Sequence, residues 1–121
     1  MLRNLICHIN KEMRNMVYII TEHWWPPGSS EQVGKIYLDV MKKFPDDKSI
    51  SKPIIRSAVW PVCEGMHSIT VSSVQPGKVK EAMDIAMNRL LALSTIEGFR
   101  YVVNIAYDLV EAMPFVGLQA P

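Results

Sequence analysis

The order in which two hydrophobic periodicities alternate along the chain limits its possible folds more than any other feature. Four segments are rich in β-branched and aromatic residues, as strands are: residues 16–25, 54–62, 66–74 and 99–109. Two intervening segments place apolar residues three and four positions apart, which is typical of amphipathic helices: residues 29–44 and 76–98. The sequence therefore predicts the order strand, helix, strand, strand, helix, strand.

This order indicates an α+β fold with the ferredoxin-like βαββαβ topology. A right-handed crossover through a helix joins two parallel strands, and a third strand fits between them. The predicted sheet has four antiparallel strands in the spatial order fourth, first, third, second. Pro61 supports this order independently, because proline cannot donate to a strand ladder and is expected at a sheet edge or a bulge. At the start of the first helix, Ser29 and Gln32 have the spacing of a capping box.

The size and charge of the chain narrow its class. A length of 121 residues fits one domain, and residues 1–15 show no sustained period, so we expect an N-terminal extension before a domain at 16–121. Thirteen basic and twelve acidic residues leave a net charge of +1, which does not favour a nucleic-acid partner. No apolar run is long enough to span a bilayer, so we expect no membrane partner and a cytoplasmic location. Cys7 and Cys63 have no metal-ligand spacing and are expected to be free thiols.

Two helices can cover only one face of a four-stranded sheet, so the other face is predicted to be open. Strand alternation assigns to the helix side Val17, Ile19, Ile69, Val71, Val103 and Ile105. It assigns to the open side Tyr18, Ile20, Glu22, Trp24, Ser68, Thr70, Ser72, Val102 and Asn104. After the fourth strand, residues 109–118 carry one charge, and a solitary domain has little reason to expose such a segment. We therefore expect an apolar C-terminal arm, at about 109–121, that packs on a second copy in a homodimer or a higher homo-oligomer.

With these features the chain resembles the dimeric α+β barrel group of ferredoxin-like proteins. The resemblance covers about residues 16–118 and rests on the element order, the edge strand with Pro61, the half-polar open face and the apolar tail. It implies that two sheets face each other around a central space that holds a small apolar or amphipathic ligand. The group includes cofactor-independent monooxygenases, lactone isomerases, dehydratases and haem-handling enzymes, so it does not select a reaction. The sequence has no glycine-rich phosphate loop, nucleophile elbow or haem-attachment motif, and we expect no cofactor.

The predicted topology brings the candidate functional residues to one rim of the sheet. The candidates for proton transfer are Glu22, His23 and His67, of which Glu22 is preferred because cover by a second subunit would desolvate it. An alternative role for Glu22 is an interface salt bridge with Arg56 or Arg100. The candidates for ligand binding are Tyr18, Trp24, Trp60, Ser68, Thr70, Asn104 and Arg100.

Three functions remain open at this point. The first is a homo-oligomeric small-molecule-binding protein, or a cofactor-independent enzyme, acting on a small organic compound in a cavity between sheets. The second is a non-catalytic assembly module with a dry dimer interface. The third is divalent-metal binding through His23 and His67, which are predicted to share one face.

Overall fold

A computed structural model describes residues 16–119 and contains the predicted elements in the predicted order. The strands are β1 (Val17–Trp25), β2 (Ser51–Val62), β3 (Gly65–Val74) and β4 (Arg100–Tyr107). The helices are η1 (Pro27–Ser29), α2 (Ser30–Lys43), α3 (Val79–Leu93), α4 (Leu109–Ala112) and η2 (Met113–Val116). The four strands form one antiparallel sheet in the order β2-β3-β1-β4, which is the predicted strand order read from the other edge. The fold is therefore α+β with an open four-stranded sheet.

Strand β2 lies at the edge of the sheet, as Pro61 predicted. Two register shifts interrupt its pairing with β3, between Pro53 and Ile55 and between Ile55 and Ala58. Each shift places one extra residue in β2, and such bulges change the direction of the side chains beside them. Arg56 lies beside these bulges, and its side chain points to the helix side of the sheet.

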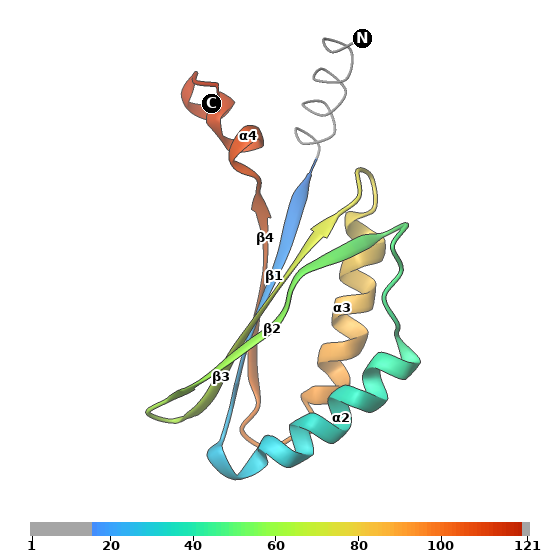
Figure 1. Cartoon of the computed structure of the whole chain (residues 1–121), viewed down its shortest axis with the longest axis vertical. Helices are drawn as coiled ribbons and strands as arrows, with labels where there is room; N and C mark the ends of the chain where they lie inside the picture. The colour runs from blue at the N-terminus through green and yellow to red at the C-terminus, as the bar shows by residue number, and fades with distance from the viewer. Residues whose placement is uncertain (1–15, 120–121) are drawn as a thin grey trace.

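Helices α2 and α3 lie on the same side of the sheet and leave its other side open (Figure 1). Ile19, Val74 and Ala82 form the buried core between the sheet and α3. Ser29 precedes α2, but its side chain makes no capping hydrogen bond, so the predicted capping box is wrong. The reason is local: η1 leads directly into α2, and the hydroxyl of Ser30 instead accepts a hydrogen bond from Trp25 Nε1 at 2.9 Å.

The predicted facing of β3 is also wrong. Thr21 and Thr70 are partners across the β1–β3 ladder, and both lie on the helix side with Ile19. Ser68 and Ser72 share that side, whereas Ile69 and Val71 point to the open side. The facing of β1 and β4 is as predicted, because Ile19 is buried and Val103 packs against the same core. The open side is consequently more apolar than the sequence indicated.

The β2–β3 hairpin turns at Cys63 and Glu64 and returns through Gly65. Gly65 has a φ of 142°, and a Cβ atom at this position would lie 2.2 Å from the carbonyl oxygen of Trp25. Only glycine fits there, and its lack of a side chain lets the hairpin turn approach the backbone at the end of β1. Cys63 is exposed and is a free thiol, whereas Cys7 lies outside the described residues.

The C-terminal segment leaves the sheet as a short helical arm, formed by α4 and η2 (Figure 1). Asp108 fixes its first residues: one carboxylate oxygen accepts from the Tyr18 hydroxyl at 2.6 Å and the other from Val110 N at 3.0 Å. The large apolar side chains of the arm are exposed, with Phe115 at 74% and Val116 at 71%. The expected N-terminal extension, residues 1–15, lies outside the described part of the chain. Within residues 16–119, no helix is both long enough and apolar enough to cross a membrane.

Candidate functional site

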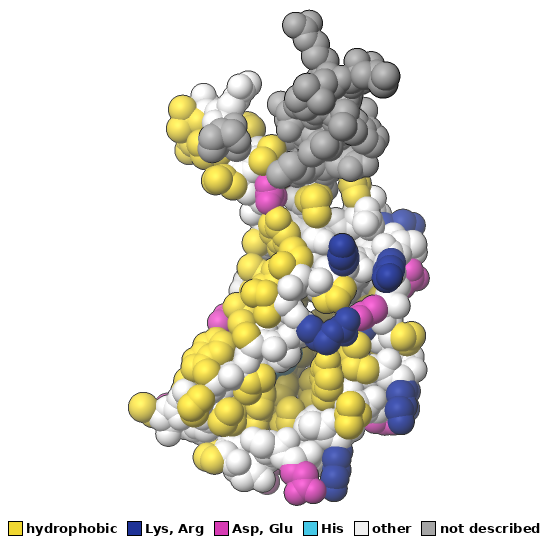
Figure 2. All heavy atoms as spheres, in the orientation of Figure 1, with side chains coloured by type: hydrophobic (Ala, Val, Ile, Leu, Met, Phe, Trp, Pro, Cys, Tyr) yellow, Lys and Arg dark blue, Asp and Glu magenta, His cyan; other side chains and the backbone are white. Residues whose placement is uncertain are grey.

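A pocket of about 420 Å³ lies between α2 and the sheet, and we name it the helix-side pocket. Figure 2 shows a hollow between the sheet and α2 that is lined largely by hydrophobic side chains. The walls come from β1, α2, β2, β3, the end of α3 and the residue that precedes β4. The lining residues are His23, Trp25, Ser30, Val33, Gly34, Tyr37, Arg56, Ser57, Val59, Ser68, Thr70, Leu93 and Phe99.

His23 stands at the junction of this pocket and a smaller one of about 120 Å³ that continues along the sheet toward α3. Its Nδ1 lies 2.8 Å from Ser68 Oγ, and its ring packs at 5.7 Å, centroid to centroid, from Phe99. Ser68 is only 2% exposed, so its hydroxyl is held firmly in place. The hydrogen bond fixes the orientation of the imidazole and leaves Nε2 as the nitrogen that can meet a ligand.

The electrostatic state of His23 follows from its surroundings. Burial lowers the pKa of His23 to about 4, and the nearby ring of His67 contributes in the same direction. The imidazole is therefore neutral near pH 7. A neutral imidazole can accept a proton or a hydrogen bond from a bound molecule.

Arg56 brings a positive charge to the same pocket. Its Nη2 lies 2.8 Å from Asp46 Oδ2, and Arg89 Nη2 lies 3.1 Å from the other oxygen of that carboxylate. Arg89 is itself fixed, because its Nε and Nη2 donate to the carbonyl oxygen of Phe44 at 3.0 and 2.6 Å. Partial burial opposes ionisation of Asp46, but the two arginines outweigh it and lower the pKa of its carboxyl group. The three side chains form a network that ties β2 to α3.

The sequence-based prediction missed Arg56 and Tyr37 as pocket residues. Tyr37 belongs to the apolar stripe of α2, and such a stripe is expected to pack on the core rather than to line a pocket. Arg56 interrupts an apolar strand, which is a detectable signal. Its facing could not be predicted because the bulges of β2 break the regular alternation.

A second group of predicted residues meets on the open side of the sheet. We name Trp24, Trp60 and His67 the open-face cluster. The imidazole of His67 stacks on Trp24 with centroids 4.4 Å apart and an interplanar angle of 17°, and Trp60 lies 4.2 Å from it at 50°. Arg100 lies over the Trp24 ring at 5.9 Å and pairs with Glu64 at 3.2 Å. The cluster joins β1 to the β2–β3 hairpin, which is far from it in sequence.

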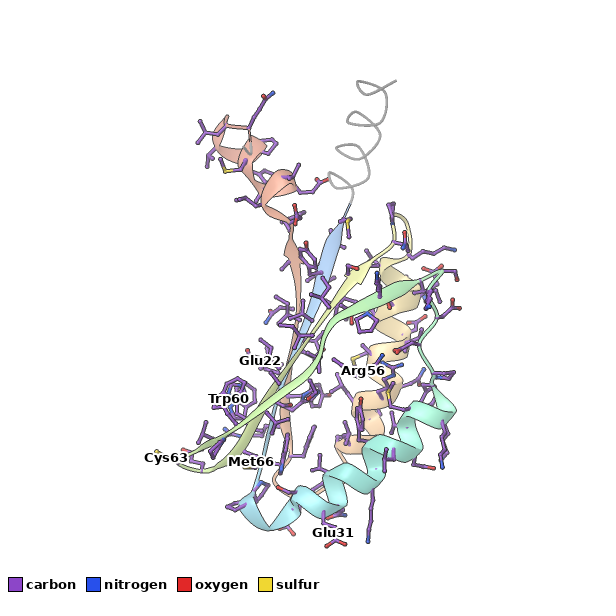
Figure 3. All side chains as sticks on the ribbon, viewed as in Figure 1. Glu22, Glu31, Arg56, Trp60, Cys63 and Met66 are labelled. Atoms are coloured by element: carbon purple, nitrogen blue, oxygen red, sulfur yellow. The ribbon has the colours of Figure 1, made fainter. Side chains whose placement is uncertain are left out.

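Glu22 lies beside this cluster and not in the helix-side pocket. Figure 3 shows Glu22 and Trp60 on one side of the sheet and Arg56 on the other. Glu22 Oε1 is 3.3 Å from His67 Nε2, close enough for an ion pair but not aligned as a hydrogen bond. Within the described chain, Glu22 thus lies against His67, and neither Arg56 nor Arg100 pairs with it.

The prediction that His23 and His67 share one face is wrong. Strand alternation and the inverted facing of β3 place His23 against Ser68 on the helix side and His67 between the tryptophans on the open side. A single metal ion cannot contact both rings through the sheet. Among residues 16–119, no group of three or more His, Cys, Asp or Glu side chains could hold a metal ion.

The remaining predicted residues divide between the two sides. Thr70 lines the helix-side pocket together with Ser68, so two of the predicted ligand-binding hydroxyls do meet His23 at a pocket. Tyr18 and Asn104 lie on the open side, where the hydroxyl of Tyr18 is engaged by Asp108. The structure therefore separates the predicted rim into a pocket with His23 and an exposed surface with the open-face cluster.

Comparison with protein-family models, curated proteins and solved structures finds no match for this chain.

Proposed function

We propose that this chain is a homo-oligomeric protein that binds a small organic molecule in the helix-side pocket and transfers a proton through His23 without a cofactor. The observation that carries the proposal is the oriented imidazole of His23 at the junction of two pockets, 2.8 Å from Ser68 Oγ. A volume of about 420 Å³ lies within the range of small-molecule sites, which are mostly apolar with a few polar groups. The helix-side pocket has this composition.

The chemistry follows from the two nitrogens of the imidazole. When Nδ1 donates its proton to Ser68 Oγ, Nε2 presents a lone pair to the pocket. A ligand O–H group placed against Nε2 can donate a hydrogen bond there. Because the pKa of His23 is about 4, the imidazole is a weak base, and it accepts and returns a proton only from a ligand group of comparable acidity. Thr70 offers a hydroxyl that can orient a polar group of the ligand.

The exposed open side favours assembly as a second function of the same chain. Val102 and Trp60 are 43% and 39% exposed, and the arm adds Phe115 and Val116. We propose that a second copy covers this side, so that two sheets face each other as in a dimeric α+β barrel with ferredoxin-like subunits. The helix-side pocket opens on the opposite side of the sheet, so ligand binding and assembly do not compete.

A pocket-filling substitution tests the binding function. Gly34 lies in α2 on the wall of the pocket, and a Cβ atom added there meets nothing within 4 Å. Gly34→Leu should preserve the fold, because removal of glycine from a helix stabilises it by about 1 kcal/mol. In a fluorescence titration with 2-naphthol as the probe, the unmodified protein should bind saturably and Gly34→Leu should bind at least tenfold more weakly.

Two variants complete this experiment. Gly34→Ala gives a similar gain in helix propensity without filling the pocket, so it should bind the probe like the unmodified protein. His23→Gln should weaken binding about fivefold, which corresponds to the loss of one hydrogen bond of about 1 kcal/mol. Equal binding by Gly34→Leu and Gly34→Ala, or an absence of saturable binding, would show that the pocket is not a ligand site.

A further inference from the structure

We infer that the ligand of the helix-side pocket is an organic monocarboxylate whose carboxylate group binds Arg56 and whose apolar body lies against α2. This inference rests on the proposed function and names the ligand class for the same pocket. It is carried by the charge, the hydrogen-bonding capacity and the wall composition of the pocket, which agree on the same chemistry.

The first step concerns charge. Arg56 and Arg89 share the single carboxylate of Asp46, so one positive charge of the network is not compensated. None of the residues that line the helix-side pocket is acidic, and His23 contributes no charge near pH 7. The pocket therefore attracts an anion, and one negative charge is enough to balance it.

The second step concerns hydrogen bonds. Arg89 uses its Nε and Nη2 on Phe44 and Asp46 and is held in the network. Arg56 donates from Nη2 to Asp46 and also forms a hydrogen bond with the Tyr37 hydroxyl, but a guanidinium has five N–H donors in a planar fork. Its side chain is 52% exposed, so the donors that Asp46 and Tyr37 do not use are accessible to a ligand. A planar fork of this kind matches the two oxygens of a carboxylate.

The third step concerns the walls. Val33, Leu93 and Phe99 supply an apolar surface on the side of α2 and the helix ends, and His23 lies between this surface and the sheet. Burial of a highly hydrated dianion against such walls would carry a large desolvation cost. A monocarboxylate with an aromatic or aliphatic body keeps its single charge at Arg56 and leaves the rest of the molecule in apolar contact.

A matched pair of probes tests the ligand class. We expect isothermal titration calorimetry to show that 2-naphthoate binds about tenfold more tightly than 2-naphthamide, which has the same ring system but no charge. Arg56→Gln should remove this preference by weakening naphthoate binding alone. Arg56→Lys, which keeps the charge but not the fork, should retain part of the preference. The control Lys43→Gln removes an exposed cation of α2 that pairs with Asp39 and should change nothing.

The outcomes separate the ligand class from the pocket itself. Equal affinities for the two probes, both lost in Gly34→Leu, would overturn the inference but would still support the helix-side pocket as a ligand site. A naphthoate preference that survives in Arg56→Gln would also overturn the inference. Failure of both probes to bind would remove the proposed function together with the inference. Because Arg56 lies half exposed on an edge strand, its substitution leaves the buried core untouched.

Discussion

At the scale of single residues, the burial of His23 links the pocket to the stability of the fold. The folded protein holds the pKa of His23 at about 4, whereas the unfolded chain has the ordinary value of 6.5. Between these two values the unfolded chain binds a proton that the folded protein does not bind. The contribution of His23 to the free energy of unfolding is therefore highest above pH 6.5 and decreases as the pH falls toward 4.

The difference between the pKa of His23 in the folded and the unfolded chain predicts that acid lowers the stability of the fold. Denaturant unfolding from pH 7 to pH 4 should show a loss of roughly 3 kcal/mol that belongs to His23, since one pKa unit corresponds to 1.36 kcal/mol. His23→Gln cannot titrate and should flatten the profile in this interval. His67→Gln should keep most of the decline, because burial is the larger cause of the low pKa of His23 and the ring of His67 is the smaller one. A profile of His23→Gln as steep as that of the unmodified protein would refute the assignment.

Residue identities alone predicted which side chains meet, but not always on which side of the sheet. His23, Trp24, Trp60 and His67 do converge at one rim, because strand order and hairpin register could be derived from the chain. The error lay in β3, where the usual rule of apolar residues inward assigned Ile69 to the helices. The rule failed because the helix side contains a partly polar pocket that Ser68 and Thr70 line, which leaves Ile69 on the open side.

At the scale of elements, β2 and the arm show where prediction from sequence reaches its limit. The position of β2 at the edge followed from the missing donor of Pro61. The two bulges of β2 could not be predicted from the sequence, because an extra residue in a strand leaves no periodic signal. The side of the sheet on which Arg56 lies could not be predicted for the same reason. The arm was predicted as apolar, but its anchor on β1 was not predicted, because the hydrogen bond joins Asp108 to Tyr18, which lies 90 positions away in sequence.

The anchoring of the arm gives a prediction at this scale. Asp108→Ala removes both the acceptor for Tyr18 and the cap of α4, and loss of such a cap costs about 1 kcal/mol. Hydrogen exchange at the amide of Val110 should become several-fold faster. Tyr18→Phe removes only the phenolic hydrogen bond and should leave Val110 better protected than Asp108→Ala does. Unchanged exchange in Asp108→Ala would mean that the arm does not depend on this residue.

At the scale of the whole molecule, the open side of the sheet is smaller than the interface of a stable dimer. Four strands spaced about 4.8 Å apart, each about eight residues of 3.4 Å long, form a face of roughly 500 Å². A stable dimer buries about 800 Å² per partner, so the sheet alone falls short and the arm must contribute. The open-face cluster is well placed for the centre of such an interface, where tryptophan side chains contribute most to affinity.

This comparison predicts the behaviour of the chain in solution. Size-exclusion chromatography with light scattering should report twice the chain mass of 13.7 kDa, or a higher multiple. Truncation after Asp108 should shift the protein toward the monomer while circular dichroism of the sheet stays unchanged. A monodisperse monomer with an intact arm at micromolar concentration would contradict the proposed assembly.

The alternation of residues 22 to 25 along β1 has a consequence for how this chain can evolve. Glu22 and Trp24 serve one side of the sheet, while His23 and Trp25 serve the other. A single inserted or deleted residue in β1 would exchange every later side chain between the two environments. Descendants of a common ancestor are thus expected to diverge in this stretch by replacement alone, with its length held constant.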